Sequence, residues 1–400
     1  MADRMTFKPN WLANGLAASA FALLATAPVY ASGLCYAGAM FEPPIAMDDT
    51  FSVGLSQPYP IVDSDSIPVT AQVSGTFPLD DAAGNGRGRF AHVFKTAEND
   101  GDIRARFYDE NNAVIGDEQL VSTEADGEQS EPSIAGLANG GYVIVWRDEM
   151  PRDDDLYNSS IRGRIYDADG NPTIAAFRVN TITPGYQIDP QITVLADGRF
   201  VVVWTDASTF GPDPDGYGVH GQIYAADGTP EGDQFLVNTA TFSWQYQPHI
   251  AALTTGGFAV VWKDYATELA QFGAIRGQVF DAAGQRVGIE FPIHETSTRV
   301  QNHEPQIVAQ PGGGLAVLWT QGYLFQSYTG PSHILQRFSG PSLPVGDPLT
   351  VLTDGYAPAE MTGLDNGELL FAYSTYSIAG CSHSQGVVSV GLRPITRLPA

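Results

Sequence analysis

Four stretches of the chain share one pattern, a run of apolar residues that follows a glycine-containing turn and ends in tryptophan. They are residues 140–146, 197–204, 256–262 and 313–319. After the turn and the residue that follows it, every position of each run is apolar. Such runs are expected of strands that are buried on both faces. Two weaker copies flank them at residues 88–94 and 366–373. The pattern predicts six repeated units, each built around one buried strand.

Each unit contains four strand-like pieces. In the third unit we predict strands at residues 190–195, 200–204, 219–224 and 234–238. The connecting turns are rich in aspartate and glycine, which suit hairpins that need a positive φ. Four short strands in a unit of 50–58 residues are typical of a β-propeller blade.

A closed ring explains the ends of the chain better than a linear stack. A solenoid needs atypical polar caps, whereas the end units here keep their apolar strands. The sixth unit lacks a clear fourth strand, and residues 50–55 form an unassigned strand-like stretch before the first unit. We therefore predict an all-β fold, a single β-propeller with six four-stranded blades, closed by this N-terminal strand. The predicted repeats span about residues 66–130, 131–188, 189–246, 247–303, 304–356 and 357–400.

These units resemble the "GGFVVVW" and "YDADG" repeats of large secreted bacterial proteins, which often stand beside hemolysin-type calcium-binding repeats. The resemblance covers about residues 88–373 and is closest at residues 204–239. It implies the propeller fold, and it brings no catalytic residue with it. The glycine–aspartate nonapeptide calcium repeats themselves do not occur in this sequence.

The N-terminus has the features of a secretory signal. Arg4 and Lys8 precede an apolar stretch at residues 12–27, and cleavage is expected after Ala31. A membrane anchor is the alternative, but the stretch is short for a spanning helix. We expect a bacterial protein exported to the periplasm or the extracellular space, with residues 32–400 forming the propeller and no integral membrane segment once the signal is removed.

Charge and cysteine content add two expectations. The net charge of −25 makes a surface that repels nucleic acid and suits solubility or cation binding. Two cysteines, Cys35 and Cys381, lie near the two ends of the chain. Because the ends of a ring meet and export is oxidising, we predict a disulfide between them; two free thiols are the alternative.

Calcium is the candidate cofactor. Asp167 and Asp169 alternate before a glycine, as in oxygen-ligand loops, although a plain hairpin turn explains them as well. A second acidic group, in the loop of the same unit, consists of Asp153, Asp154 and Asp155.

One position recurs directly before the proline of the first strand in four units. Its occupants are Glu131, Asp189, Gln247 and Glu304. Since this strand is innermost in a blade, we expect these side chains to ring one mouth of the central channel. Close carboxylates repel unless a cation or a raised pKa relieves them, so the ring is a candidate ligand or cation site. Capping of turns is the alternative.

No motif for catalysis is present. The sequence contains neither a Gly-x-Ser-x-Gly elbow nor an HExxH pair. Loop aromatics could stack on sugars or pack on the loops: Trp244, Tyr246, Tyr323, Phe325 and Tyr328. We therefore predict an exported binding or surface-interaction module without catalytic activity, whose ligand is a cation, a glycan or a protein. The alternative is a glycan-acting hydrolase that uses carboxylates at the channel mouth.

Overall fold

The computed structural model describes fourteen parts of the chain. They are residues 81–96, 101–111, 113–122, 127–149, 158–208, 212–265, 273–295, 300–323, 332–340, 342–352, 360–363, 367, 369–377 and 387–395. All regular structure in these residues is β-strand, which confirms the all-β prediction. The predicted signal, the predicted strand at residues 50–55 and both cysteines lie outside the described residues.

The strands form antiparallel sheets that follow one another along the chain. The first sheet holds β1 (Asp81–Gly84), β2 (Phe90–Lys95), β3 (Ile103–Tyr108) and β4 (Val114–Leu120). The second holds β5 (Gln129–Gly136), β6 (Tyr142–Asp148), β7 (Ser160–Tyr166) and β8 (Phe177–Arg178). The third holds β9 (Gln187–Val194), β10 (Phe200–Asp206), β11 (Gly218–Tyr224) and β12 (Pro230–Leu236).

The remaining strands repeat the same order. The fourth sheet holds β13 (Gln245–Ala252), β14 (Phe258–Asp264), β15 (Ala274–Phe280) and β16 (Arg286–His294). The fifth holds β17 (Val300–Ala309), β18 (Leu315–Tyr323), β19 (Ser332–Phe338) and β20 (Pro344–Leu352). A last sheet has three described strands, β21 (Glu360–Gly363), β22 (Leu369–Ser377) and β23 (Val387–Ile395).

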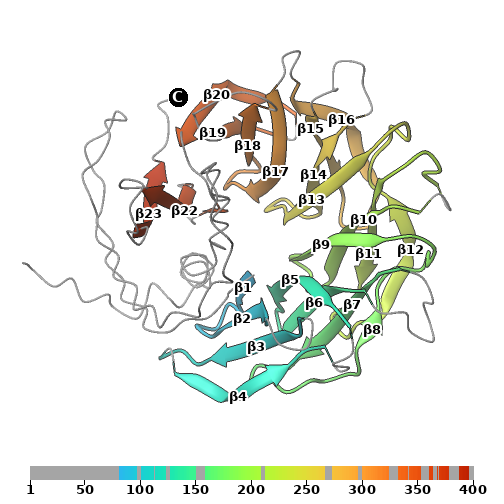
Figure 1. Cartoon of the computed structure of the whole chain (residues 1–400), viewed down its shortest axis with the longest axis vertical. Coiled ribbons are helices and arrows are strands. Elements are labelled where there is room, and N and C mark those ends of the chain that lie inside the picture. Colours follow the sequence, from blue (N-terminus) through green and yellow to red (C-terminus); the bar gives the residue numbers. More distant parts are fainter. Residues whose placement is uncertain are drawn as a thin grey trace, which may run out of the picture.

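The sheets stand side by side around a common centre, in the arrangement of a β-propeller (Figure 1). In the five four-stranded sheets the first strand lies nearest the centre and the fourth lies at the periphery (Figure 1). No described helix is long and apolar enough to cross a membrane.

The core consists of layers between neighbouring sheets. One cluster joins Val93 and Phe107 of the first sheet to Tyr142 and Trp146 of the second, and equivalent clusters follow between each later pair. The four repeat tryptophans are at most 2% exposed. They are therefore core residues, as the all-apolar runs predicted, and burial of such large rings is a major source of stability.

The innermost strands differ from the prediction in one respect. The strands β5, β9, β13 and β17 begin before the proline instead of at it, and each contains a β-bulge at that point. In β9, Gln191 pairs with Val203 but Ile188 pairs with Thr205, so the residues between them fall out of register. The bulge accommodates proline, which cannot donate a ladder hydrogen bond, and a strand can therefore continue through it.

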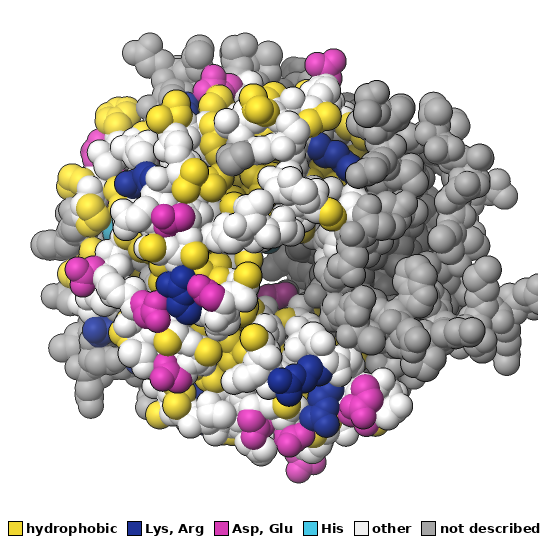
Figure 2. Space-filling view, turned by 180° about the vertical axis from the view of Figure 1, so that it is seen from behind, with side chains coloured by type: hydrophobic (Ala, Val, Ile, Leu, Met, Phe, Trp, Pro, Cys, Tyr) yellow, Lys and Arg dark blue, Asp and Glu magenta, His cyan; other side chains and the backbone are white. Residues whose placement is uncertain are grey.

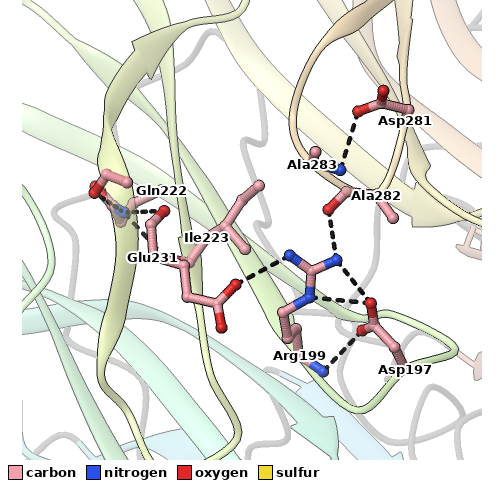
Figure 3. Close-up of polar contacts among 9 residues, drawn as sticks. Asp197, Arg199, Gln222, Ile223, Glu231, Asp281, Ala282 and Ala283 are labelled. Atoms are coloured by element: carbon pink, nitrogen blue, oxygen red, sulfur yellow. Dashed lines mark hydrogen bonds and ion pairs between the residues drawn. The ribbon is translucent and has the colours of Figure 1, made fainter.

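Arginines also connect neighbouring sheets through their turns. Arg199, in the turn before β10, donates to Asp197 at 2.6 Å and to Glu231 at 3.0 Å within its own sheet. It also donates to the carbonyl of Ala282 in the next sheet, at 2.7 Å (Figure 3). Arg89 makes the same bridge between the first and second sheets, to the carbonyl of Ala168 at 3.1 Å.

Candidate functional site

A cavity of about 410 Å³ lies among the innermost strands β1, β5, β9, β13 and β17. Seen from behind, the molecule is hollowed at this place, with acidic side chains at the back of the hollow (Figure 2). All four residues of the predicted ring line this cavity: Glu131, Asp189, Gln247 and Glu304. The structure thus brings together residues that lie up to three repeats apart in sequence.

The bulges explain how these side chains are presented. Each of the four residues has a φ of 50–54°, in the left-handed region that L-residues with long side chains rarely adopt. Residues before proline are normally extended, so each position stores strain. Such strain persists only where surrounding structure enforces it, and it is concentrated at functional sites.

Glu131 and Asp189 form a connected pair. The carboxylate of Glu131 accepts from Arg147 Nη1 at 3.1 Å and from the backbone N–H of Asp189 at 2.7 Å. Asp189 Oδ2 accepts from the hydroxyl of Thr205 at 3.2 Å. That hydroxyl oxygen also accepts from the backbone N–H of Gln247 at 3.2 Å. The contacts therefore pass from sheet to sheet around the cavity.

The environments of the two carboxyl groups differ. Burial, and next the charge of Glu131, raise the pKa of Asp189 to about 6. Glu131 instead faces the guanidinium of Arg147. One group can therefore carry a proton near neutral pH beside another that is ion-paired, which is the condition for dividing acid and base roles between two carboxyls.

The far side of the ring contains a buried lysine. Lys263 is 1% exposed, and its Nζ lies 2.7 Å from His303 Nδ1. Burial lowers the pKa of Lys263 to about 8 and that of His303 to about 4. Burial also raises the pKa of Glu304. Lys263 Nζ stands 5.3 Å and 5.2 Å from the ring centres of Tyr246 and Tyr265, within cation–π range.

Further polar side chains of the inner strands form a second tier beside the ring. Asp81 Oδ2 accepts from the backbone N–H of Ile134, and Gln306 Oε1 accepts from that of Met361, both at 2.9 Å. His249 Nδ1 accepts from Ile307 N at 3.3 Å, so its proton resides on Nε2. Burial lowers the pKa of His249 to about 4. This tier fixes the distances between inner strands and lines the same cavity.

The predicted calcium ligands have other roles where they are described. Asp167 Oδ1 accepts from the backbone N–H groups of Asp169 and Asn171, at 3.0 Å and 2.8 Å. Asp169 forms an ion pair with Arg89 at 2.7 Å. In the described residues no group of three or more His, Cys, Asp or Glu side chains is arranged to hold a metal. Asp153, Asp154 and Asp155 lie outside the described residues, and calcium binding stays a prediction, as does cation binding by the ring.

The described aromatics form a row near the cavity. Trp244 is 53% exposed and stacks on Tyr217, with ring centres 5.6 Å apart. Tyr217 meets the edge of Tyr246 at 6.3 Å, and Tyr246 stacks on Tyr265 at 5.9 Å. The side chains of Tyr323, Phe325 and Tyr328 lie outside the described residues.

Comparison with known proteins gives likenesses in structure. No family model and no curated protein matches the chain. A protein of unknown function from Dyadobacter fermentans is 14% identical, with a TM-score of 0.47 over 67% of this chain and 78% of that one. An endo-arabinase from Bacteroides thetaiotaomicron is 14% identical, with a TM-score of 0.41 over 67% and 94%. An ulvan lyase is 9% identical, with a TM-score of 0.46 over 76% and 78%.

These likenesses correct one expectation. The prediction of a module without catalytic activity is contradicted, because the similar structures with a stated activity are glycoside hydrolases and a polysaccharide lyase. The alternative of a glycan-acting enzyme agrees better with them. Since these three structures are at most 14% identical to this chain, with TM-scores of at most 0.47, no substrate or residue role is carried over to it. The case for a reaction rests on the side chains of the cavity.

Sequence reasoning missed the partners of the ring. Arg147, Thr205 and Lys263 each follow the tryptophan of their repeat, and each contacts a ring residue or its neighbour. The signal was available, because a polar residue at the end of an apolar strand recurs in every repeat. Its meaning depends on the bulge, which brings this polar position against the ring and which the sequence pattern did not show.

Proposed function

We propose that this chain is an exported glycan-acting enzyme whose carboxyl pair is Glu131 and Asp189. The observation that carries the proposal is their placement: two connected carboxyls on strained bulges, in a cavity at the centre of the sheets. Most glycoside hydrolases use a pair of Asp or Glu side chains that flank the scissile bond. The cavity is within the size range of ligand sites in proteins.

The roles follow from the surroundings of each group. Asp189, with its pKa raised to about 6, retains a proton that it donates to the oxygen of the leaving sugar. Glu131, ion-paired with Arg147, acts on the opposite side, either on the anomeric carbon or on an attacking water. Arg147 and the N–H of Asp189 hold the Glu131 carboxylate in one orientation, which reduces the cost of aligning it.

The sixth blade and the closed ring belong to the same proposal. β21 to β23 pack on the fifth sheet through a cluster that joins Leu318 and Val351 to Met361 and Leu369. These three strands repeat the order of the first three strands in the other sheets. We propose that they form a sixth blade, and that residues 50–55 supply its missing strand.

Activity is tested by incubating the chain with a panel of polysaccharides that includes arabinan and ulvan. Hydrolysis is followed by release of reducing ends, and eliminative cleavage by the ultraviolet absorbance of the unsaturated product. We expect Asp189→Asn and Glu131→Gln each to lower kcat by at least about a hundredfold on the substrate found, since loss of a positioned acid or base removes that much or more.

Glu118→Gln is the matched control. Glu118 is also partly exposed and forms an ion pair with Arg106 at 2.8 Å, but it lies on the outer strand β4. The control is expected to retain wild-type activity. If all members of the panel resist the wild-type chain, or if both cavity variants cleave at the wild-type rate, the proposal is wrong.

A further inference from the structure

Two exposed aromatic side chains occupy the same position in neighbouring sheets. Tyr186 and Trp244 directly precede the inner strands β9 and β13, and they are 48% and 53% exposed. Their carbonyls accept backbone hydrogen bonds from Ala207 at 2.8 Å and Tyr265 at 2.9 Å. Their backbones are therefore fixed by the sheet at the end where the ring residues lie, while their rings remain in water.

Trp244 is held more firmly than exposure alone implies. One face of its ring stacks on Tyr217 at 5.6 Å and 26°. Gly216, with a φ of 139°, allows this approach, because a Cβ there would lie 2.7 Å from Trp244 Cδ1. The adjacent Ser243 adopts a φ of 66°, another strained position. A large ring kept rigid yet half in water is typical of a binding surface, since a fold gains little from exposing it.

The row of rings that begins at Trp244 leads toward the carboxyl pair. From Trp244 the row of rings passes through Tyr217 to Tyr246. Tyr246 directly precedes Gln247, which lines the cavity. Burial raises the pKa of the Tyr246 hydroxyl, and its interactions with Tyr265 and the charge of Asp189 raise it further.

We infer that Trp244, backed by Tyr217, is a stacking subsite for a neutral sugar unit outside the cavity, in a glycan whose scissile bond lies at Asp189. This inference rests on the proposed function for the class of its occupant. A sugar ring presents a flat C–H face that stacks on an aromatic ring and hydroxyls that meet polar side chains around it. Acidic sugars fit less well, because Glu131, Asp189 and Glu304 line the adjacent cavity and the chain carries a net charge of −25.

The test measures binding apart from cleavage. The full chain with Trp11→Phe retains five tryptophans, of which Trp146, Trp204, Trp262 and Trp319 are at most 2% exposed. The fluorescence that acrylamide can quench in this variant therefore comes from Trp244. Neutral polysaccharides (arabinan, xylan, galactan and a β-glucan) and the acidic polygalacturonate are used as probes, by gel retardation and by protection of the fluorescence from acrylamide.

We expect at least one neutral polysaccharide to retard the chain and to shield Trp244, while polygalacturonate does neither. Trp244→Ala should weaken that binding by about tenfold or more, as for a central aromatic contact, and Trp244→Phe should restore most of it. Ile289→Ala, which removes an 86% exposed apolar side chain from the outer strand β16, is the matched control and should bind as the parent does.

The two proposals fail in different ways. If no neutral polysaccharide binds, or if Trp244→Ala binds as tightly as its parent, the stacking subsite is wrong, whatever the chain cleaves. If binding depends on Trp244 but the wild-type chain cleaves no member of the panel, the subsite stands and the proposed reaction falls.

Discussion

At the scale of single residues, Asp189 combines several features that cost stability. It is held on a strained bulge, partly shielded from water, and next to another acid. Each of these features is unfavourable to folding when the carboxyl is charged. Sites that store such cost are expected where proteins do chemistry, and the cost itself can be measured.

We predict that Asp189→Asn stabilises the folded chain at about pH 8. The folded pKa of Asp189 is raised to about 6 from 3.8, so the folded state binds the proton more tightly than the unfolded state. Its contribution to stability is complete below the unfolded pKa and is lost as pH rises through the folded pKa. Asparagine carries no charge, so the variant should gain about 1–2 kcal/mol after allowance for partial exposure.

Urea unfolding at about pH 4 and about pH 8 checks this window. The gain should be present at the higher pH and nearly absent at the lower. Asp197→Asn is the opposite case, because the hydrogen bond from Arg199 lowers the pKa of Asp197, and it should destabilise at the higher pH. An Asp189→Asn variant that is less stable than wild type at both pH values would contradict the assignment of a buried, strained carboxyl.

At the scale of elements, the proline bulge is the device that builds the site. It recurs in β5, β9, β13 and β17, always with the residue before proline at positive φ. A bulge turns a side chain that ordinary alternation would send into a sheet interface toward the centre. The repeat thus produces a ring from one local distortion.

Gln247 allows the strain to be tested without touching the proposed carboxyl pair. Glycine adopts a positive φ without steric cost, whereas a β-branched residue does so poorly. We predict that Gln247→Gly is at least as stable as wild type, and that Gln247→Val is destabilised by about 1–3 kcal/mol. Thermal melts of both variants decide the matter. A valine variant as stable as the glycine variant would show that the bulge carries no strain.

The turn arginines are a second element-scale device, because each joins two sheets. Replacing Arg199 by alanine removes contacts to Asp197, Glu231 and the carbonyl of Ala282 (Figure 3). We predict a loss of about 1–2 kcal/mol in urea unfolding, which is typical of hydrogen bonds from a charged donor. Arg199→Lys keeps the charge without the planar fork and should fall between the two. An alanine variant with an unchanged urea midpoint would mean that the bridge adds nothing.

At the scale of the whole molecule, the sequence predicted what depends on periodicity. The buried tryptophans and the order of strands follow from apolar runs that recur at one spacing, and both are confirmed. The position of the ring residues around one cavity follows from the same repeat. These features depend on the local pattern of apolar and polar residues, which can be read from one sequence.

Other features depend on contacts between repeats and were not predictable. Lys263 lies against His303, forty residues away along the chain, and the row from Trp244 to Tyr265 joins three separate loops to β13. The strands β5, β9, β13 and β17 also begin before their prolines, because a bulge interrupts the ladder there and lets the strand continue. Strict alternation of apolar and polar residues does not predict such a bulge. The hydrogen bond from the backbone N–H of Asp189 to Glu131 also joins two sheets, so the sequence did not show that these two carboxyls are connected.

Closure of the ring leads to the last prediction, which concerns Cys35 and Cys381. If residues 50–55 complete the blade of β21 to β23, the two ends of the chain meet at that blade, and a disulfide there would join them. Because such a bond closes a very long loop, it restricts the unfolded chain strongly, and its removal should cost a few kcal/mol, typically about 2–5. Cys381→Ser should therefore melt at a lower temperature than wild type under oxidising conditions and at the same temperature after reduction. Peptide mapping without reduction should recover the two cysteines in one linked species. An equal melting temperature in oxidising buffer, together with two unlinked thiols, would mean that the ring is held by its strands alone.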